Sequence, residues 1–114
     1  ATVESSAHEN YKQAVLGAGD GGTVFTLKKL TPVRMIRTPF ALKVLQAERD
    51  GATREELESL LGRRREMMGI FEGNLEEGEF EAGQSSGLVR EILPAGEVVR
   101  RMMEEYRVVV QRFP

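Results

Sequence analysis

Apolar residues near the start of the chain recur every three or four positions, which is the spacing of one face of an α-helix. This periodicity predicts a helix over residues 6–17. Ser6 and Glu9 have the spacing of a capping box, in which the serine hydroxyl accepts the Glu9 amide and the Glu9 carboxylate accepts the Ser6 amide. Four glycines between residues 17 and 22 predict where this helix ends.

The pattern changes to alternation in the next segment, which is rich in valine, threonine, phenylalanine and isoleucine. We predict a hairpin in which residues 23–28 pair with residues 33–37, with the turn at Leu30–Pro32. The alternation places Phe25 and Leu27 on one face of the first strand. A single hairpin is marginally stable in water, so we expect a helix to cover it.

Start signals predict two further helices after the hairpin. Thr38 is an N-cap residue followed by proline at the first helical position, and an apolar face follows it. Thr53 and Glu56 form a second capping box, and Gly62 ends the helix that it starts. A short helix is predicted within RRREMMGIF, residues 63–71, with its apolar side chains partly buried.

The last third of the chain combines an irregular stretch with a long amphipathic pattern. Residues 72–87 contain four glycines, and helical character resumes near Ser86. After Pro94 a wide apolar stripe from Val98 to Phe113 spans about five helical turns. The stripe is large for so small a chain, so we expect part of it to pack on a surface outside this chain or on a partner.

Residues 82–87 read Ala-Gly-Gln-Ser-Ser-Gly, an uncharged stretch within a highly charged chain. Two interpretations are open. The first is a turn and a helix N-terminus, with Ser85 or Ser86 as the cap and the glycines supplying turn geometry. The second is a backbone that passes close to a bound group, for which small residues leave room. The two are compatible, because a helix N-terminus also attracts anions.

Composition is that of one globular α+β domain. The chain has 114 residues, of which 40% are hydrophobic and 30% charged, and a formal net charge of -2. This near balance gives no electrostatic reason to expect nucleic acid. The absence of cysteine excludes disulfides and thiolate metal sites. The apolar runs are too short to span a bilayer, and we expect a cytoplasmic location without membrane partners.

Most of the remaining reactive side chains have an ordinary structural interpretation. His8 stands at a helix start and is expected to be a surface residue rather than a base. The basic run Arg63–Arg65 and the acidic residues of Glu76–Glu81 are expected to be solvated, although such arginines can also dock an acidic carrier protein. The pairs Met67–Met68 and Met102–Met103 are expected to be core residues.

Three stretches in a fixed order resemble one enzyme family. They are ESSAHENYKQAVLGA near the start, PVRMIRTPF in the hairpin, and EGNLEEGEFEAGQSSGLVREILPAGEVVRRM after it. In this order they are similar to the C-terminal portion of the flavin-dependent nitronate monooxygenases, formerly called 2-nitropropane dioxygenases. The flavin-dependent enoyl-acyl-carrier-protein reductases belong to the same family. The similarity covers nearly the whole chain.

The resemblance implies a C-terminal fragment of a TIM-barrel flavoprotein that binds FMN, mainly helical α+β with one hairpin. Residues 1–19 would be the last barrel helix region, residues 20–80 an inserted small α+β domain, and residues 81–114 an active-site return loop with the C-terminal helix. The resemblance also places one segment near substrate and flavin, consisting of Glu81, Ala82, Gly83, Gln84 and Ser85. Relatives usually have Met or Ser where this chain has Glu81.

By the same resemblance, the flavin-phosphate loops and the catalytic histidine belong to barrel strands outside these residues. We therefore expect no catalytic residue, no metal, no bound cofactor and no turnover in the isolated chain. The expected partners are the missing barrel portion and, in the parent protein, FMN and a small nitronate or acyl substrate. The alternative is a stand-alone, non-enzymatic α+β module that dimerises or binds another protein through its C-terminal helix. In a third version, the chain completes a separately encoded barrel.

Overall fold

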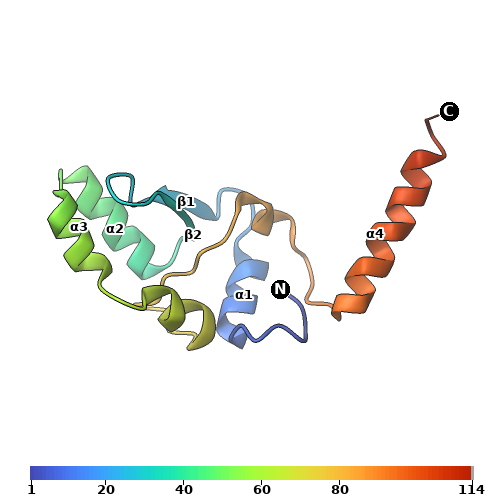
Figure 1. The fold of residues 1–114 in the computed structure, drawn as a ribbon, viewed down its shortest axis with the longest axis horizontal. Coiled ribbons are helices and arrows are strands. Elements are labelled where there is room, and N and C mark those ends of the chain that lie inside the picture. The colour runs from blue at the N-terminus through green and yellow to red at the C-terminus, as the bar shows by residue number, and fades with distance from the viewer. Residues whose placement is uncertain (114) are drawn as a thin grey trace.

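The computed structural model describes residues 1–113 and shows a mainly helical α+β fold with one two-stranded antiparallel hairpin (Figure 1), as the sequence predicts. A π-helical turn, η1, and a 3₁₀ turn, η2, separate the central helices from the last one. In chain order the elements are α1 (Glu9–Gly17), β1 (Thr23–Thr26), β2 (Val33–Ile36), α2 (Pro39–Arg49), α3 (Arg54–Leu61), η1 (Met67–Phe71), η2 (Gln84–Leu88) and α4 (Ala95–Val110).

α1 begins at Glu9, later than predicted, because His8 and not Ser6 is its N-cap. The His8 Nδ1 atom accepts a hydrogen bond from the Asn10 amide at 3.0 Å. The Glu9 carboxylate accepts the side chain of Gln13 one turn later at 2.8 Å instead of turning back to Ser6. The predicted capping box of Ser6 and Glu9 is therefore wrong, whereas the helix ends at the first of the four glycines, as predicted.

The hairpin has the predicted pairing but shorter strands. Thr26 lies opposite Val33 at the closed end of the ladder. The next residue, Leu27, has a φ of +55°, so the chain leaves the strand there and the Leu27 side chain turns into the core. Phe25 is exposed on the other side. The prediction that Phe25 and Leu27 share a face is wrong, because the strand ends at Thr26, between the two residues.

The main core lies between the hairpin and α2, with α3 packed beside it. The Thr38 hydroxyl accepts the Ala41 amide at the start of α2, and the predicted capping box of Thr53 and Glu56 starts α3. Leu57 of α3 is fully buried. The buried cluster between hairpin and α2 consists of Leu27, Met35, Phe40, Ala41 and Val44. The helices therefore supply the apolar cover that a lone hairpin needs.

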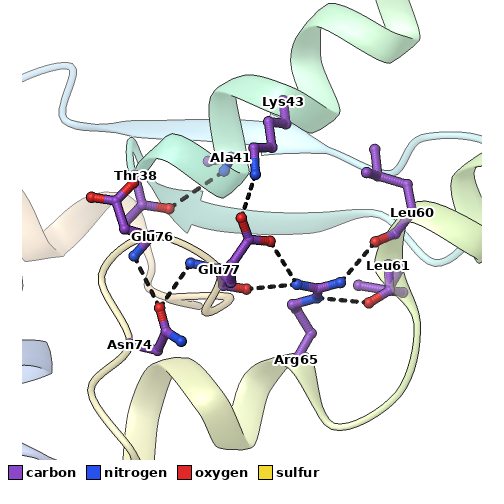
Figure 2. Close-up of polar contacts among 9 residues, drawn as sticks. All are labelled: Thr38, Ala41, Lys43, Leu60, Leu61, Arg65, Asn74, Glu76 and Glu77. Atoms are coloured by element: carbon purple, nitrogen blue, oxygen red, sulfur yellow. Dashed lines mark hydrogen bonds and ion pairs between the residues drawn. The ribbon is translucent and has the colours of Figure 1, made fainter.

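Arg65 connects the end of α3 to the loop that follows η1 (Figure 2). Its guanidinium donates to the carbonyls of Leu60 and Leu61 at 3.0 and 2.8 Å. It also donates to the carbonyl and the carboxylate of Glu77, at 3.0 and 3.1 Å. The same group lies over the Phe40 ring, 4.6 Å from its centre. Because the Arg65 side chain is only 18% exposed, water competes weakly for these contacts.

Glu77 completes this connection from the loop. Lys43 of α2 donates to one oxygen of the Glu77 carboxylate, while Arg65 binds the other. The Lys43 ammonium, aided by Arg65, holds the pKa of the Glu77 carboxyl below its usual range. The Asn74 side chain accepts the amides of Glu76 and Glu77 at 3.1 and 2.9 Å and shapes the turn. The expectation that this basic run is solvated is wrong for Arg65, whereas Glu77 is ion-paired but still 42% exposed.

α4 projects away from the other elements (Figure 1). Every residue from Val99 to Phe113 is exposed. Met102 and Met103 are therefore not core residues, contrary to the prediction, whereas Met67 and Met68 are half-buried. The Cα radius of gyration is 17.0 Å, against about 13 Å for a compact domain of this length. As expected from the sequence, the apolar stripe is not covered by the residues that the structure describes.

We expect Arg65→Lys to lower the free energy of unfolding by about 2–3 kcal/mol, because an ammonium cannot replace the fork of hydrogen bonds to Leu60, Leu61 and Glu77. Urea unfolding followed by circular dichroism measures the change. Arg63→Lys is the matched control, since Arg63 is exposed, and should change stability by less than about 0.5 kcal/mol. Equal effects of the two substitutions would contradict the role assigned to Arg65.

Candidate functional site

Residues 80–82 run beside β2 as a short strand-like segment. The Ile36 amide donates to the Phe80 carbonyl at 2.9 Å, and the Ala82 amide donates to the Arg34 carbonyl at 3.1 Å. The position between these two bonds forms an isolated antiparallel bridge with β2. Backbone pairing therefore holds the segment against the edge of the hairpin.

α1 holds the same segment from its other side. The Phe80 side chain is fully buried in a second cluster with Val15 and Ile36, and its ring lies 5.7 Å from the ring of Tyr11. The Tyr11 hydroxyl donates to the Glu81 carbonyl at 2.6 Å. Burial of this hydroxyl, together with the Glu81 charge, raises the pKa of Tyr11. The segment is thus fixed by α1 as well as by β2.

The five site residues implied by the family resemblance are consecutive and follow this fixed segment. Glu81 is exposed and forms the bridge to β2, and Ala82 is half-buried against the second cluster. Gly83 precedes η2, and Gln84 and Ser85 are the first two residues of that turn. All three are exposed. The structure therefore presents residues 83–85 to solvent from a rigid base.

Neither candidate serine caps η2. Gly83 occupies the cap position, and no side-chain hydrogen bond caps the turn. Ser86 is buried, and its amide donates to the Gly83 carbonyl at 3.1 Å. The prediction of Ser85 or Ser86 as a cap is wrong, because the helical segment here is one 3₁₀ turn and not the start of a longer helix.

Gly87 and Gly83 have different structural environments. A Cβ atom at Gly87 would lie 2.5 Å from the carbonyl oxygen of Gly19, so only glycine lets η2 pack on the loop after α1. A Cβ atom at Gly83 would meet only the Ser85 Oγ atom, at 3.8 Å. The φ of Gly83, -73°, also suits any residue. The fold of the described residues therefore gives no reason for glycine at position 83.

An open groove of about 440 Å³ runs along the same segment and is lined by Pro32, Val33, Arg34, Glu81, Ala82 and Gly83. The Arg34 guanidinium donates to the Thr23 hydroxyl at 3.3 Å and lies 5.8 Å from the centre of the Phe25 ring. A cation beside a small-residue backbone suits a flat or anionic group. Sequence reasoning did not single out Arg34, because the contact between β2 and residues 80–82 that places it here is long-range.

The environment of Glu79 differs from the prediction. It was expected in a solvated loop, yet it is only 4% exposed. Burial, followed by the neighbouring charges of Glu81 and Glu66, raises the pKa of Glu79 to about 7, while Arg65 acts in the opposite direction. The carboxyl group is therefore partly protonated at neutral pH.

If FMN binds as the resemblance implies, residues 83–85 and the groove beside them would contact one side of it. The groove is open on one side, and the side chains of Gln84 and Ser85 are exposed without a hydrogen-bond partner among residues 1–113. Within that range, no three His, Asp or Glu side chains are placed to hold a metal ion. No helix in the described part of the chain is long and apolar enough to cross a membrane. The exposed amide and hydroxyl are groups that can hydrogen-bond a flavin, and FMN binding and the cytoplasmic location stay predictions.

Comparison with known structures shows which proteins this chain is similar to. The fold of the chain resembles a part of the flavin-dependent enoyl-acyl-carrier-protein reductases of the nitronate monooxygenase family, which confirms the resemblance stated from the sequence. The matched structures are those of FabK from Thermotoga maritima. One FabK structure matches with a TM-score of 0.87 and 35% identity over 97% of this chain and 35% of FabK. A point mutant of FabK matches with a TM-score of 0.80 and 31% identity, over 97% of this chain and 32% of that one.

The chain thus spans about a third of the FabK chains that it matches. No protein-family model matches the chain, and no curated protein does either.

We expect Glu79→Gln to stabilise the protein at pH 8 by about 1–3 kcal/mol. The folded-state pKa of about 7 lies above the usual carboxyl value, so the folded state binds the proton more tightly. Wild-type stability should therefore fall as pH rises from about 4.5 to 7, and the advantage of the glutamine variant should vanish near pH 4. Urea unfolding across this pH range measures the difference.

The matched control is Glu76→Gln, which removes an exposed carboxylate from the same loop. It should leave the pH dependence unchanged. A wild-type stability that does not fall between pH 5 and 8 would contradict the buried environment of Glu79.

Proposed function

We propose that this chain is the substrate-covering segment of an FMN-dependent oxidoreductase whose TIM-barrel portion lies outside these residues. The observation that carries the proposal is the similarity to FabK over 97% of the chain at 31% and 35% identity. Because FabK is an enoyl-acyl-carrier-protein reductase, the proposed substrate is an enoyl thioester. A small nitronate is the substrate of the other branch of the family.

In this proposal the chain divides into three parts with different tasks. Residues 1–19 form the last barrel helix region, residues 20–80 a small inserted domain, and residues 81–114 the return to the active site with the C-terminal helix. The firm attachment of residues 80–82 to α1 and β2 supports this division, since a catalytic wall has to be rigid.

Residues 81–85 would form the wall beside flavin and substrate. Bound FMN would supply the hydride chemistry. The small backbone at Gly83 would let the chain approach closely and exclude water. The exposed Gln84 amide and Ser85 hydroxyl would donate hydrogen bonds to a substrate carbonyl oxygen. Glu81, exposed at the start of the segment, and Arg34 would together set the charge at the mouth of the groove.

The apolar face of α4 supports the same proposal. Its exposed apolar residues are Val99, Met102, Met103, Tyr106, Val108, Val109 and Val110. A face of this extent needs cover in water, and the proposed barrel portion would supply it. The same observation favours a second candidate function, a module that dimerises through α4. Molar mass measured by light scattering across a concentration series distinguishes the two, because only the second predicts a discrete dimer of this chain.

We expect the purified chain to be colourless after FMN is added and the excess removed, because one wall does not retain a flavin. The absorption spectrum at roughly 350–500 nm, where flavins absorb, measures how much FMN the chain retains. A stoichiometric amount of bound flavin would show that the chain builds a complete site. It would contradict the proposal that FMN binding needs the barrel portion.

In the intact enzyme, we expect Gly83→Val to lower kcat/KM by at least about tenfold, a loss of roughly 1.4 kcal/mol of transition-state stabilisation. The reason is the branched side chain in the proposed close approach. Gly83→Ala should have a smaller effect. Thermal unfolding of both variants should match the wild type, because the position has room within this chain.

Gly87→Ala provides the contrasting control. Its Cβ atom would collide with the Gly19 carbonyl, so it should lower stability. Unchanged activity of Gly83→Val, with flavin and substrate both bound normally, would remove position 83 from the proposed wall.

A further inference from the structure

A pocket of about 400 Å³ lies between the hairpin turn, α3 and the segment that leads to the candidate site. We call it the Glu79 pocket. Its apolar walls are Leu27, Leu30, Val33 and Leu61, and its charged lining is Arg54, Glu58, Glu66, Glu79 and Glu81. The volume is within the range of small-molecule sites. Apolar walls and several carboxylates therefore meet in one cavity.

The alternation of the chain explains why two carboxylates line the same pocket. In extended backbone, successive side chains point to opposite sides. Phe80 is buried against α1 and Ile36. Glu79 and Glu81, on either side of it, line the pocket next to the hairpin turn and α3. One short segment therefore gives the fold its buried aromatic residue and gives the pocket its acids.

Glu79 is the buried member of the acidic set. It is 4% exposed and lines the pocket, and none of the ion pairs within residues 1–113 includes its carboxylate. The Arg65 guanidinium forms hydrogen bonds with the Glu77 carboxylate and with two backbone carbonyls. Burying a carboxylate without a direct partner is costly, and the one cation whose charge acts on Glu79, Arg65, is bonded elsewhere.

The rest of the lining does not supply that cation. Arg54 is the only basic residue that lines the pocket within residues 1–113, and it pairs with Glu58 at 2.9 Å on the exposed side of α3. Glu66, Glu79 and Glu81 therefore leave an excess of negative charge. The mutual repulsion of these three groups adds to the raised pKa of Glu79.

A metal ion does not suit this arrangement. No three acidic or histidine side chains in residues 1–113 are close enough to coordinate one. An organic cation differs, because its charge needs one close carboxylate while its carbon chain needs apolar walls. Leu30, Val33 and Leu61 provide those walls.

We propose that the Glu79 pocket binds a small aliphatic amine in its ammonium form, with the Glu79 carboxylate as the direct partner, Glu66 and Glu81 as the surrounding charge, and the leucine walls in contact with the alkyl chain. The pocket shares Val33 and Glu81 with the groove of the candidate site, but its ligand is different and its test does not depend on the flavin proposal. It also explains why a carboxylate that costs stability stands in a buried position: sites that bind ligands commonly sacrifice stability in this way.

Binding should depend on pH, because the ammonium pairs only with ionised Glu79. With a pKa of about 7, the ionised fraction of Glu79 falls about tenfold between pH 8 and pH 6, and the affinity should fall by about the same factor. The other groups that face Glu79 are Glu66 and Glu81, which repel its charge, and Arg65, which favours it. Arg54 and Glu58 line the pocket as a pair.

The test is a titration of the full chain with n-butylammonium chloride, followed by amide chemical shifts in ¹⁵N-labelled protein. We expect saturable shifts in the hairpin turn and at residues 79–81. Sodium chloride at equal ionic strength and the neutral 1-pentanol are the ligand controls, and neither should reproduce them. Glu79→Gln should weaken binding at pH 8 at least about tenfold, whereas Glu76→Gln, an exposed acid on the same loop, should not change it.

Three results would overturn the proposal. One is a set of shifts that sodium chloride reproduces, which indicates screening alone. Another is equal binding of 1-pentanol and n-butylammonium, which indicates an apolar cavity without charge recognition. The third is unchanged affinity in Glu79→Gln, whose fold is checked by its amide spectrum before the titration.

Discussion

The contacts of the Arg65 guanidinium are the constraint on which the arrangement of this chain depends. One planar group binds the last carbonyls of α3, covers the Phe40 ring of the main core, and holds the carbonyl and carboxylate of Glu77. These contacts fix the loop before Glu79 relative to the hairpin. Because the loop is fixed, the chain enters the edge of β2 in one register, and the register decides which residues face the core and which face solvent.

Both the candidate wall at residues 81–85 and the Glu79 pocket follow from that register. Phe80 points into the cluster with α1, so Glu79 and Glu81 point to the hairpin turn and α3. Beyond them the chain passes Ala82 and reaches the exposed residues 83–85. A shift of one residue would bury a carboxylate against Val15 and expose the phenylalanine. The candidate wall and the acidic pocket are thus consequences of the same backbone pairing, and the loop anchored by Arg65 sets both.

Local signals in the sequence predicted the fold class, the hairpin, the capping box of Thr53 and Glu56, and the end of α3 at Gly62, because neighbouring residues decide these features. Tertiary contacts decide the rest. Ser6 loses the cap of α1 to His8, whose own amide donates to the Ile70 carbonyl across the chain. Arg65 and Glu79 looked solvated, because no local pattern shows that residues 77–81 return to α3 and β2. The family resemblance singles out residues 81–85, which stays a prediction, and it did not single out Arg34 or the acidic pocket.

Two features of the described chain have no explanation within residues 1–113. α4 extends its apolar residues into solvent, and the radius of gyration exceeds that of a compact domain. Gly83 is free of the internal contacts that require glycine at Gly87, yet it stands at the exposed end of a rigid segment. The uncovered apolar face of α4 would be covered by a large partner surface. A glycine that the fold itself does not require would suit a group that approaches the backbone closely. A barrel portion with a bound flavin would meet both needs at once, whereas dimerisation through α4 would account only for the helix.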